Sequence, residues 1–203
     1  MATNRQQFRQ NTGQSMRAYW KLRIAVDAAL AVPDRVAGLV LIAPAVTGAP
    51  PPDVASIEPE LRWFDQEMDE QIDLSNIDEA NRYEVWLWLD GPRGPERRVS
   101  GSARTLASEM SRIALTNNPV EAQRADVDAR NRLEDIGVST TVAFGSLVAS
   151  FIIERSKTVA ERIPRAFTIV LDGLAHLQFL EEPSVVESIV IQSITPSDPV
   201  LSH

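Results

Sequence analysis

His176, the one histidine inside this chain, is the first residue to consider for chemistry. It lies in "DGLAHLQFLEEP", residues 172–183, between a predicted strand and a predicted helix. An imidazole titrates near neutral pH and can take a proton from a hydroxyl group during hydrolysis. It does so only with partners, namely a nucleophile and a group that orients the ring. We therefore expect His176 to be a catalytic base or the remnant of one.

The composition excludes several other kinds of site. The 203 residues include no cysteine, which excludes disulfides, thiolate metal sites and a cysteine nucleophile. The two histidines, His176 and His203, are too few for a histidine-based metal site, and we expect no metal and no cofactor. A net charge of −8 argues against a nucleic-acid partner.

The sequence also predicts no membrane partner. Its longest apolar run, around residues 38–46, is far shorter than the roughly 20 residues that a membrane span needs. The first residues, "MATNRQQFRQNTG", contain no apolar signal region. We therefore expect a cytoplasmic location.

Hydrophobic periodicity predicts strands that alternate with helices around a mainly helical middle. Apolar residues recur at helical spacing before Pro33, and a continuous β-rich run follows. The predicted elements are a helix over 17–31, a strand over 39–45, mainly helices over 54–130, a strand over 139–145, a helix over 151–163, a strand over 166–173 and a helix over 182–194. Such alternation indicates an α/β fold with parallel strands and right-handed crossovers.

Several phrases in this order resemble the C-terminal portion of the α/β-hydrolase superfamily. "GQSM" and "PDRVAGLVLIAPAVTG" resemble its nucleophile elbow and sixth strand. "LEDIGVSTTVAFG" resembles the strand before the acid loop, and "LDGLAHLQFLEEPSVVESI" resembles the histidine loop and final helix. The resemblance covers residues 13–192. It implies an incomplete α/β-hydrolase-like fold of three layers, with about three parallel strands, flanking helices and a helical lid.

The resemblance also divides the chain into parts. We expect residues 1–12 to be disordered or irregular, and residues 13–52 and 131–195 to form the α/β-hydrolase-like core. Residues 53–130 would then form the helical lid.

The resemblance assigns catalytic roles to three residues. His176 falls at the position of the base, with Ala175 where a glycine usually stands. Ser15 would be the nucleophile, and the N–H of Met16 would be one oxyanion donor. A second register, aligned backwards from "RIAVDAAL", puts Tyr19 at the nucleophile position instead. Ser15 would then suit a helix N-cap.

The family's acid is missing from its expected position. The family carries an aspartate after the penultimate strand, and Val148 stands there in this sequence. Valine cannot accept the imidazole N–H, and losing the acid costs on the order of 10⁴ in turnover in a related triad. Asp172 lies on the wrong side of the turn, and Glu181 and Glu182 better suit the N-terminus of the last helix.

The family's first five strands have no counterpart in this sequence. They would precede Gly13, where twelve mostly polar residues stand. The strand over 39–45 would then lie at an edge of the sheet, and a continuously apolar edge is a site of association. We therefore expect self-association or a partner that covers strand 39–45.

Three tryptophans, Trp63, Trp86 and Trp88, lie in the predicted lid. They either pack the helices on one another or form a wall of an apolar ligand pocket, and these two roles can coexist.

The function that we predict follows from the missing parts. An α/β-hydrolase-like protein with Val148 at the acid position and without the first five strands would be impaired or inactive as a serine hydrolase. The alternative is an active serine hydrolase that cleaves an ester, a lactone or a similar small apolar carbonyl substrate with Ser15 and His176, completed by a partner chain. A third interpretation is a lyase or isomerase that uses His176 without the serine, although no residue selects it.

Overall fold

A three-stranded parallel sheet lies at the centre of the described part of the chain. The computed structural model describes residues 23–50, 52, 57–73, 75–117 and 127–194. Within them the strands are β1 (Gly38–Ile42), β2 (Ser139–Gly145) and β3 (Ala166–Leu171), in the order β1-β2-β3. Both strand pairs are parallel. The predicted parallel strands are therefore confirmed, whereas the expected irregular segment 1–12 lies outside the described residues.

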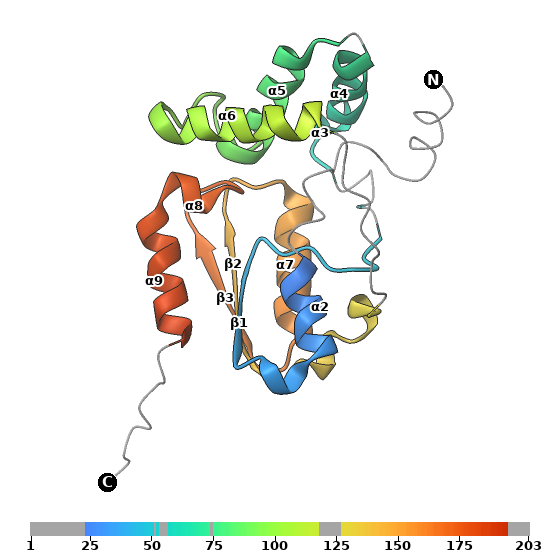
Figure 1. The fold of residues 1–203 in the computed structure, drawn as a ribbon, viewed down its shortest axis with the longest axis vertical. Coiled ribbons are helices and arrows are strands. Elements are labelled where there is room, and N and C mark those ends of the chain that lie inside the picture. The colour runs from blue at the N-terminus through green and yellow to red at the C-terminus, as the bar shows by residue number, and fades with distance from the viewer. Residues whose placement is uncertain (1–22, 51, 53–56, 74, 118–126, 195–203) are drawn as a thin grey trace.

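Helices cover both faces of this sheet (Figure 1). They are α2 (Ile24–Ala31) and α7 (Ser150–Arg162) on one face, and α9 (Pro183–Ile194) on the other. Leu39 and Leu41 pack with α2 and α7, whereas Val40 between them packs on the side of α9, as the two-residue period of a strand requires. Coverage on both faces explains why β1 reads as a continuous apolar run.

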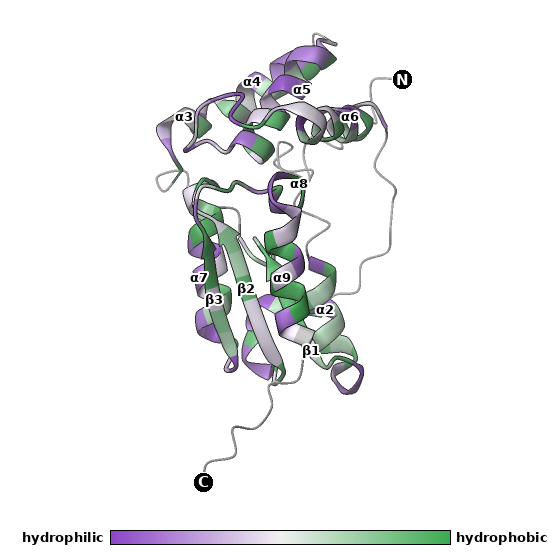
Figure 2. Cartoon of the chain, turned by 90° about the vertical axis from the view of Figure 1, so that its left-hand side faces the viewer, coloured by the Kyte–Doolittle hydropathy of each residue, from purple (hydrophilic) through white to green (hydrophobic). Residues whose placement is uncertain are grey.

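The part of the chain that follows β1 and precedes β2 forms a group of helices, which lies above the carboxyl ends of the strands (Figure 1). It consists of α3 (Pro59–Arg62), α4 (Phe64–Asp73), α5 (Ile77–Val85), a π-helical turn (Trp86–Asp90) and α6 (Gly101–Thr116), and we call it the helical layer. Figure 2 shows that α4, α5 and α6 mix polar and apolar residues along their lengths, whereas β3 is largely apolar. The apolar sides of these helices pack on the sheet through Phe64 and Met68, which join Phe144 in one core.

Short elements complete the described chain. They are three 3₁₀ turns (Pro33–Arg35, Ala129–Asn131 and Leu133–Asp135) and α8 (Gln178–Glu181). The segment between β3 and α8, residues 172–177, carries His176, and we call it the histidine loop.

Two strands end earlier than the sequence predicts. β1 ends at Ile42 rather than at residue 45, because Ala43 adopts a positive φ of 45° and Pro44 follows it. β3 ends at Leu171 rather than at residue 173, because a turn follows in which the N–H of Leu174 donates to the carbonyl of Leu171. The predicted bounds of β2, by contrast, are confirmed.

Close contact between the end of β2 and the histidine loop requires a glycine at position 145. A Cβ atom at Gly145 would lie 2.1 Å from the carbonyl oxygen of Leu174 and 2.5 Å from that of Ala175. The N–H of Leu147 donates to the Leu174 carbonyl over 2.9 Å. The backbone at the end of β2 therefore lies in direct contact with the backbone of the histidine loop, with no room for a side chain between them.

We expect Gly145→Ala to destabilise the protein by about 1–3 kcal/mol, because the added methyl group must displace backbone atoms rather than a flexible side chain. Urea unfolding followed by circular dichroism measures this loss. Gly137→Ala is the matched control, because a Cβ there meets no atom within 4 Å. Equal stability of the two variants would contradict the prediction.

Candidate functional site

His176 lies against Trp88 at the junction of the histidine loop and the helical layer. The two ring centroids are 4.8 Å apart, and the ring planes are tilted by 58°. The backbone N–H groups of His176 and Leu177 both donate to the carbonyl oxygen of Trp88 over 3.1 Å. The tryptophan therefore fixes both the ring and the backbone of the candidate base.

The Trp88 carbonyl is available because a helix ends there. The turn Trp86–Asp90 is π-helical, and the N–H of Gly91 closes it on the carbonyl of Trp86 over 2.9 Å. The last carbonyl groups of a helix lack partners within it and need other donors. Those of Leu89 and Asp90 accept hydrogen bonds from Arg98 over 2.8 and 3.0 Å. π-Helical turns occur frequently at functional sites.

A buried ion pair ties the same turn to the histidine loop. Arg98 pairs with Glu181, whose side chain is only 2% exposed. A carboxylate oxygen of Glu181 also accepts the N–H of Ala175, directly before His176, over 2.9 Å. Arg98 further donates to the carbonyl of Gly173 over 3.0 Å. The guanidinium group of Arg98 thus bonds both to the π-helical turn and to the histidine loop with Glu181.

Glu181 does not have the role that the sequence predicts for it. The sequence predicts that it favours the N-terminus of the last helix, yet it ends α8, and its carboxylate binds Arg98 and the histidine loop. Burial raises the pKa of the Glu181 carboxyl group, and the hydrogen bond from Arg98 acts in the opposite direction. The carboxylate thus depends on Arg98 to offset its desolvation.

A second buried carboxylate organises the segment that carries Arg98. Asp90 is fully buried and pairs with Arg104 of α6. It also accepts the backbone N–H groups of Arg97 and Val99, over 2.8 and 3.2 Å. These bonds hold the loop between the π-helical turn and α6 in the shape that directs Arg98 toward the histidine loop.

The ring of His176 lacks the acid that a catalytic histidine requires. Its Nδ1 atom is buried and has no hydrogen-bond partner in the described part of the chain. Val148, at the position of the family's acid, is buried in the core that also includes Trp88. Asp172, the nearest carboxylate before His176 in sequence, accepts the Ser146 hydroxyl over 3.0 Å instead.

Burial lowers the pKa of His176 to about 4, because a charged imidazolium would be desolvated. The ring is therefore neutral at pH 7. The charged state that follows proton abstraction has no carboxylate partner at Nδ1 among the described residues.

The predicted tryptophans fall into two groups. Trp88 is buried and contacts His176, and its indole N–H donates to Glu84 over 2.5 Å. Trp63 and Trp86 stack on each other with centroids 6.4 Å apart, and Tyr83 meets Trp63 edge-on at 5.6 Å. Trp63 and Trp86 thus help to hold the helical layer together, which was the packing alternative. A role for any of the three in ligand binding stays a prediction.

The other predicted site residues lie outside the described residues. Ser15, Met16 and Tyr19 belong to residues 1–22. The roles of nucleophile and oxyanion donor stay predictions.

Within the described ranges, no group of three or more histidine or acidic side chains could hold a metal ion. None of the helices in these ranges has the length and apolar character that crossing a membrane requires.

Sequence reasoning missed the residues that hold the junction together. Arg98, Asp90 and Arg104 gave no signal beyond a polar loop followed by a helix, because their partners lie on other elements. It also missed Gln178, which is fully buried and whose amide nitrogen and oxygen have no partner in the described structure. A glutamine within an apolar phrase is a weak signal, since most glutamines are exposed.

The chain has the α/β-hydrolase fold, as three solved structures show. MenH from S. aureus matches with a TM-score of 0.55 and 14% identity, over 84% of this chain and 63% of that chain. A hydrolase from Oleispira antarctica matches with a TM-score of 0.54 and 18% identity, over 83% and 60%. Est816, an N-acyl homoserine lactone degrading enzyme, matches with a TM-score of 0.52 and 18% identity, over 83% and 62%.

The chain spans less than two thirds of the length of these structures. No protein-family model matches the sequence, and no curated protein matches it. The predicted resemblance is therefore confirmed for the fold, whereas the division into core and lid stays a prediction.

We expect Arg98→Met to destabilise the protein by about 3–5 kcal/mol near pH 7, because the variant leaves a buried carboxylate unpaired. The loss should shrink as the pH falls toward about 5. Without Arg98, Glu181 takes up a proton at a higher pH than in the wild type, and protonation removes the buried charge. Urea unfolding at both pH values measures the effect.

Arg112→Met is the control for this variant. Arg112 pairs with Asp78 on the surface, where both side chains are at least half exposed, and such a pair contributes about 0–1 kcal/mol. If Arg98→Met cost no more than Arg112→Met, or if its deficit grew at low pH, the buried pair would not have the role described.

We expect the imidazole of His176 to titrate near pH 4 in the folded protein, measured by NMR. The folded state should lose stability as the pH falls from about 6.5 toward 4, because the unfolded chain binds the proton more readily in that range. His176→Gln should remove this part of the pH dependence and identify the resonance by difference from His203. A titration near 6.5 would show that the ring is hydrated.

Proposed function

We propose that this chain is an α/β-hydrolase-like protein that is impaired or inactive as a serine hydrolase, a pseudoenzyme of that fold. The observation that carries the proposal is the state of His176. The ring is held in a fixed place, but its Nδ1 atom has no partner among the described residues, and Val148 is buried where the acid would stand.

Two physical effects weaken His176 as a base. Without a carboxylate, nothing stabilises the imidazolium that forms when the ring takes a proton, and this loss costs on the order of 10⁴ in turnover in a related triad. A pKa of about 4 also lies well below working pH, whereas a general base is most effective when its pKa is close to it. Both effects have the same physical cause, because the Nδ1 atom of the ring is buried without a partner among the described residues.

The alternative is an active serine hydrolase with Ser15 as nucleophile, the Met16 N–H as oxyanion donor and His176 as base. Its support is the firm placement of His176, through three hydrogen bonds to the loop backbone at Ala175, His176 and Leu177. The helical layer would then act as the lid. Its substrate would be a small apolar ester or lactone, the latter being the class on which the similar structure Est816 acts.

We expect no hydrolysis of p-nitrophenyl butyrate or of an N-acyl homoserine lactone that depends on His176 or Ser15. The measurement compares the initial rates of the wild type, His176→Ala and Ser15→Ala. A fluorophosphonate that labels serine nucleophiles is the second readout. We expect no labelling of Ser15 in the folded protein.

Saturable hydrolysis that both substitutions abolish, together with labelling of Ser15, would contradict the proposal and establish the alternative. Asp172→Asn is the matched control for a loop substitution, since Asp172 binds Ser146 rather than the ring. Its rate should equal that of the wild type under either outcome.

A further inference from the structure

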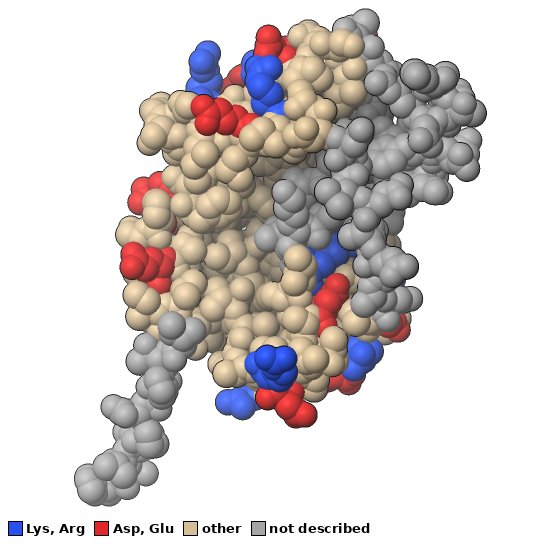
Figure 3. Space-filling model, viewed as in Figure 1, with Lys and Arg blue, Asp and Glu red and all other residues tan. Residues whose placement is uncertain are grey.

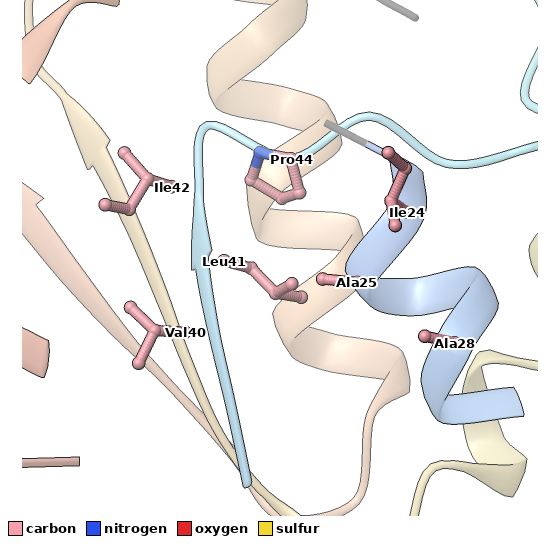
Figure 4. Close-up of a pocket in the computed structure, with 7 residues that line it drawn as sticks. All are labelled: Ile24, Ala25, Ala28, Val40, Leu41, Ile42 and Pro44. Carbon is pink, nitrogen blue, oxygen red and sulfur yellow. The ribbon is translucent and has the colours of Figure 1, made fainter. Parts of the chain in front are cut away.

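The hollow between α2 and β1 offers no group for covalent chemistry. It has a volume of about 300 Å³ and is lined by apolar side chains of these two elements and by Pro44. Figure 4 shows Leu41 pointing from β1 toward α2, and Val40 and Ile42 pointing to the other side of the strand. The described surface around β1 in Figure 3 likewise carries no charged side chain between α2 and α9. The cover of strand 39–45 by another chain stays a prediction.

A reactive group of a different kind lies at the start of the histidine loop. The dipeptide Asp–Gly occurs twice in this sequence, as Asp90–Gly91 and as Asp172–Gly173. The amide nitrogen of such a glycine can attack the carboxyl group of the aspartate, because glycine has no side chain to hinder the approach. A cyclic succinimide forms and a water molecule leaves. Water then opens the ring, and opening at the backbone carbonyl leaves isoaspartate, whose side-chain CH₂ has become part of the backbone.

Of these two bonds, Asp172–Gly173 is the one that water reaches. Asp172 and Gly173 are both exposed, whereas Asp90 is fully buried. They occupy the centre of a turn that the N–H of Leu174 closes on the carbonyl of Leu171 over 3.3 Å. The φ of 73° at Gly173 is typical of the third residue of a type II turn. Asp172–Gly173 is therefore accessible for both steps of the reaction.

The hydroxyl group of Ser146 holds both reacting groups of this bond. It donates to Oδ1 of Asp172 over 3.0 Å and accepts the N–H of Gly173 over 2.9 Å. Ring closure requires the carboxyl carbon to approach the amide nitrogen, and it requires that nitrogen to give up the proton that Ser146 now accepts. Both hydrogen bonds must break before the ring forms, so their loss adds to the barrier.

We propose that Asp172–Gly173 is a site of covalent modification, and that Ser146 protects it from isomerisation to isoaspartate. When Ser146 releases the two groups, the nitrogen of Gly173 bonds to Cγ of Asp172. The carboxyl group loses its OH, the amide loses its proton, and these leave as water. One water molecule is taken up again when the ring opens, so the reaction needs no other reactant and leaves the composition of the chain unchanged.

The modification would displace the histidine loop. The N–H of Ser146 donates to the carbonyl of Leu171 over 3.0 Å, and that of Leu147 donates to the carbonyl of Leu174 over 2.9 Å. Isoaspartate adds one backbone atom between these two attachment points. The close contact of Gly145 with the loop backbone leaves no room for the longer chain. The Ser146 hydroxyl therefore preserves the geometry of the loop as the protein ages.

Incubation of the full chain at neutral pH and physiological temperature tests the proposal. Peptides that contain Asp172 are separated by liquid chromatography, and protein isoaspartate methyltransferase identifies the isomer. We expect Ser146→Ala to raise the rate of isomerisation roughly tenfold, because two hydrogen bonds that oppose ring closure are lost. Ser146→Thr retains a hydroxyl group and should react more slowly than Ser146→Ala.

Two controls separate protection by Ser146 from a general loosening of the chain. Asp90–Gly91 is the internal control, because Arg104 pairs with its carboxylate and the carbonyl of Trp86 accepts the N–H of Gly91. It should stay unmodified in every folded variant. Ser100→Ala is the matched serine substitution, at a residue whose side chain caps no helix, and it should leave the rate unchanged. Circular dichroism checks that each variant is folded.

A further comparison does not depend on any substitution. In urea both Asp–Gly bonds are free, and we expect Asp172–Gly173 to isomerise several-fold faster there than in the folded wild type. Equal rates in the folded and unfolded wild type, or equal rates in wild type and Ser146→Ala, would overturn the proposal. Hydrolase activity plays no part in these measurements, so their outcome is independent of the proposed function.

Discussion

A helix that ends inside a protein must find donors for its last carbonyl groups, and this requirement determines how the helical layer meets the sheet. The π-helical turn after α5 leaves the carbonyls of Trp88, Leu89 and Asp90 to be satisfied from outside. The histidine loop and Arg98 supply the donors. Because Arg98 carries a charge into a buried place, Glu181 must accompany it. The position of His176 is a consequence of this set of bonds.

The same bonds fix the position of His176 and yet leave its ring without an acid partner. Its backbone and the face of its ring are fixed by Trp88, and the preceding N–H by Glu181. None of these contacts reaches Nδ1, where a catalytic histidine needs an acceptor. The carboxylate of Glu181, which binds the backbone of the loop, is engaged by the Arg98 guanidinium group and the N–H of Ala175. The described residues thus fix the position of His176, but they do not activate its ring as a base.

The sequence alone predicts an element correctly where the pattern that identifies the element is local. The bounds of β2 are predicted correctly, because its β-branched and aromatic residues form one run that ends at Gly145. The end of β1 is not, since it depends on the positive φ of Ala43. Glu181 was assigned by a local rule about helix ends, whereas its partner, Arg98, lies 83 residues away in sequence. Long-range ion pairs leave no periodic trace in a sequence, which is why the bonds around His176 emerged only from the structure.

The π-helical turn has a consequence for the tolerance of this chain to changes in length. A π-helical turn is an α-helical turn that has gained one residue. Loss of a single residue between Trp86 and Asp90 would rotate everything after the deletion by about 100° relative to α5. The carbonyl that now meets the histidine loop would then face elsewhere, and the fully buried Asp90 would leave its donors. The number of residues in this turn is therefore more tightly constrained than their types. Insertions or deletions should be confined to other segments of the helical layer.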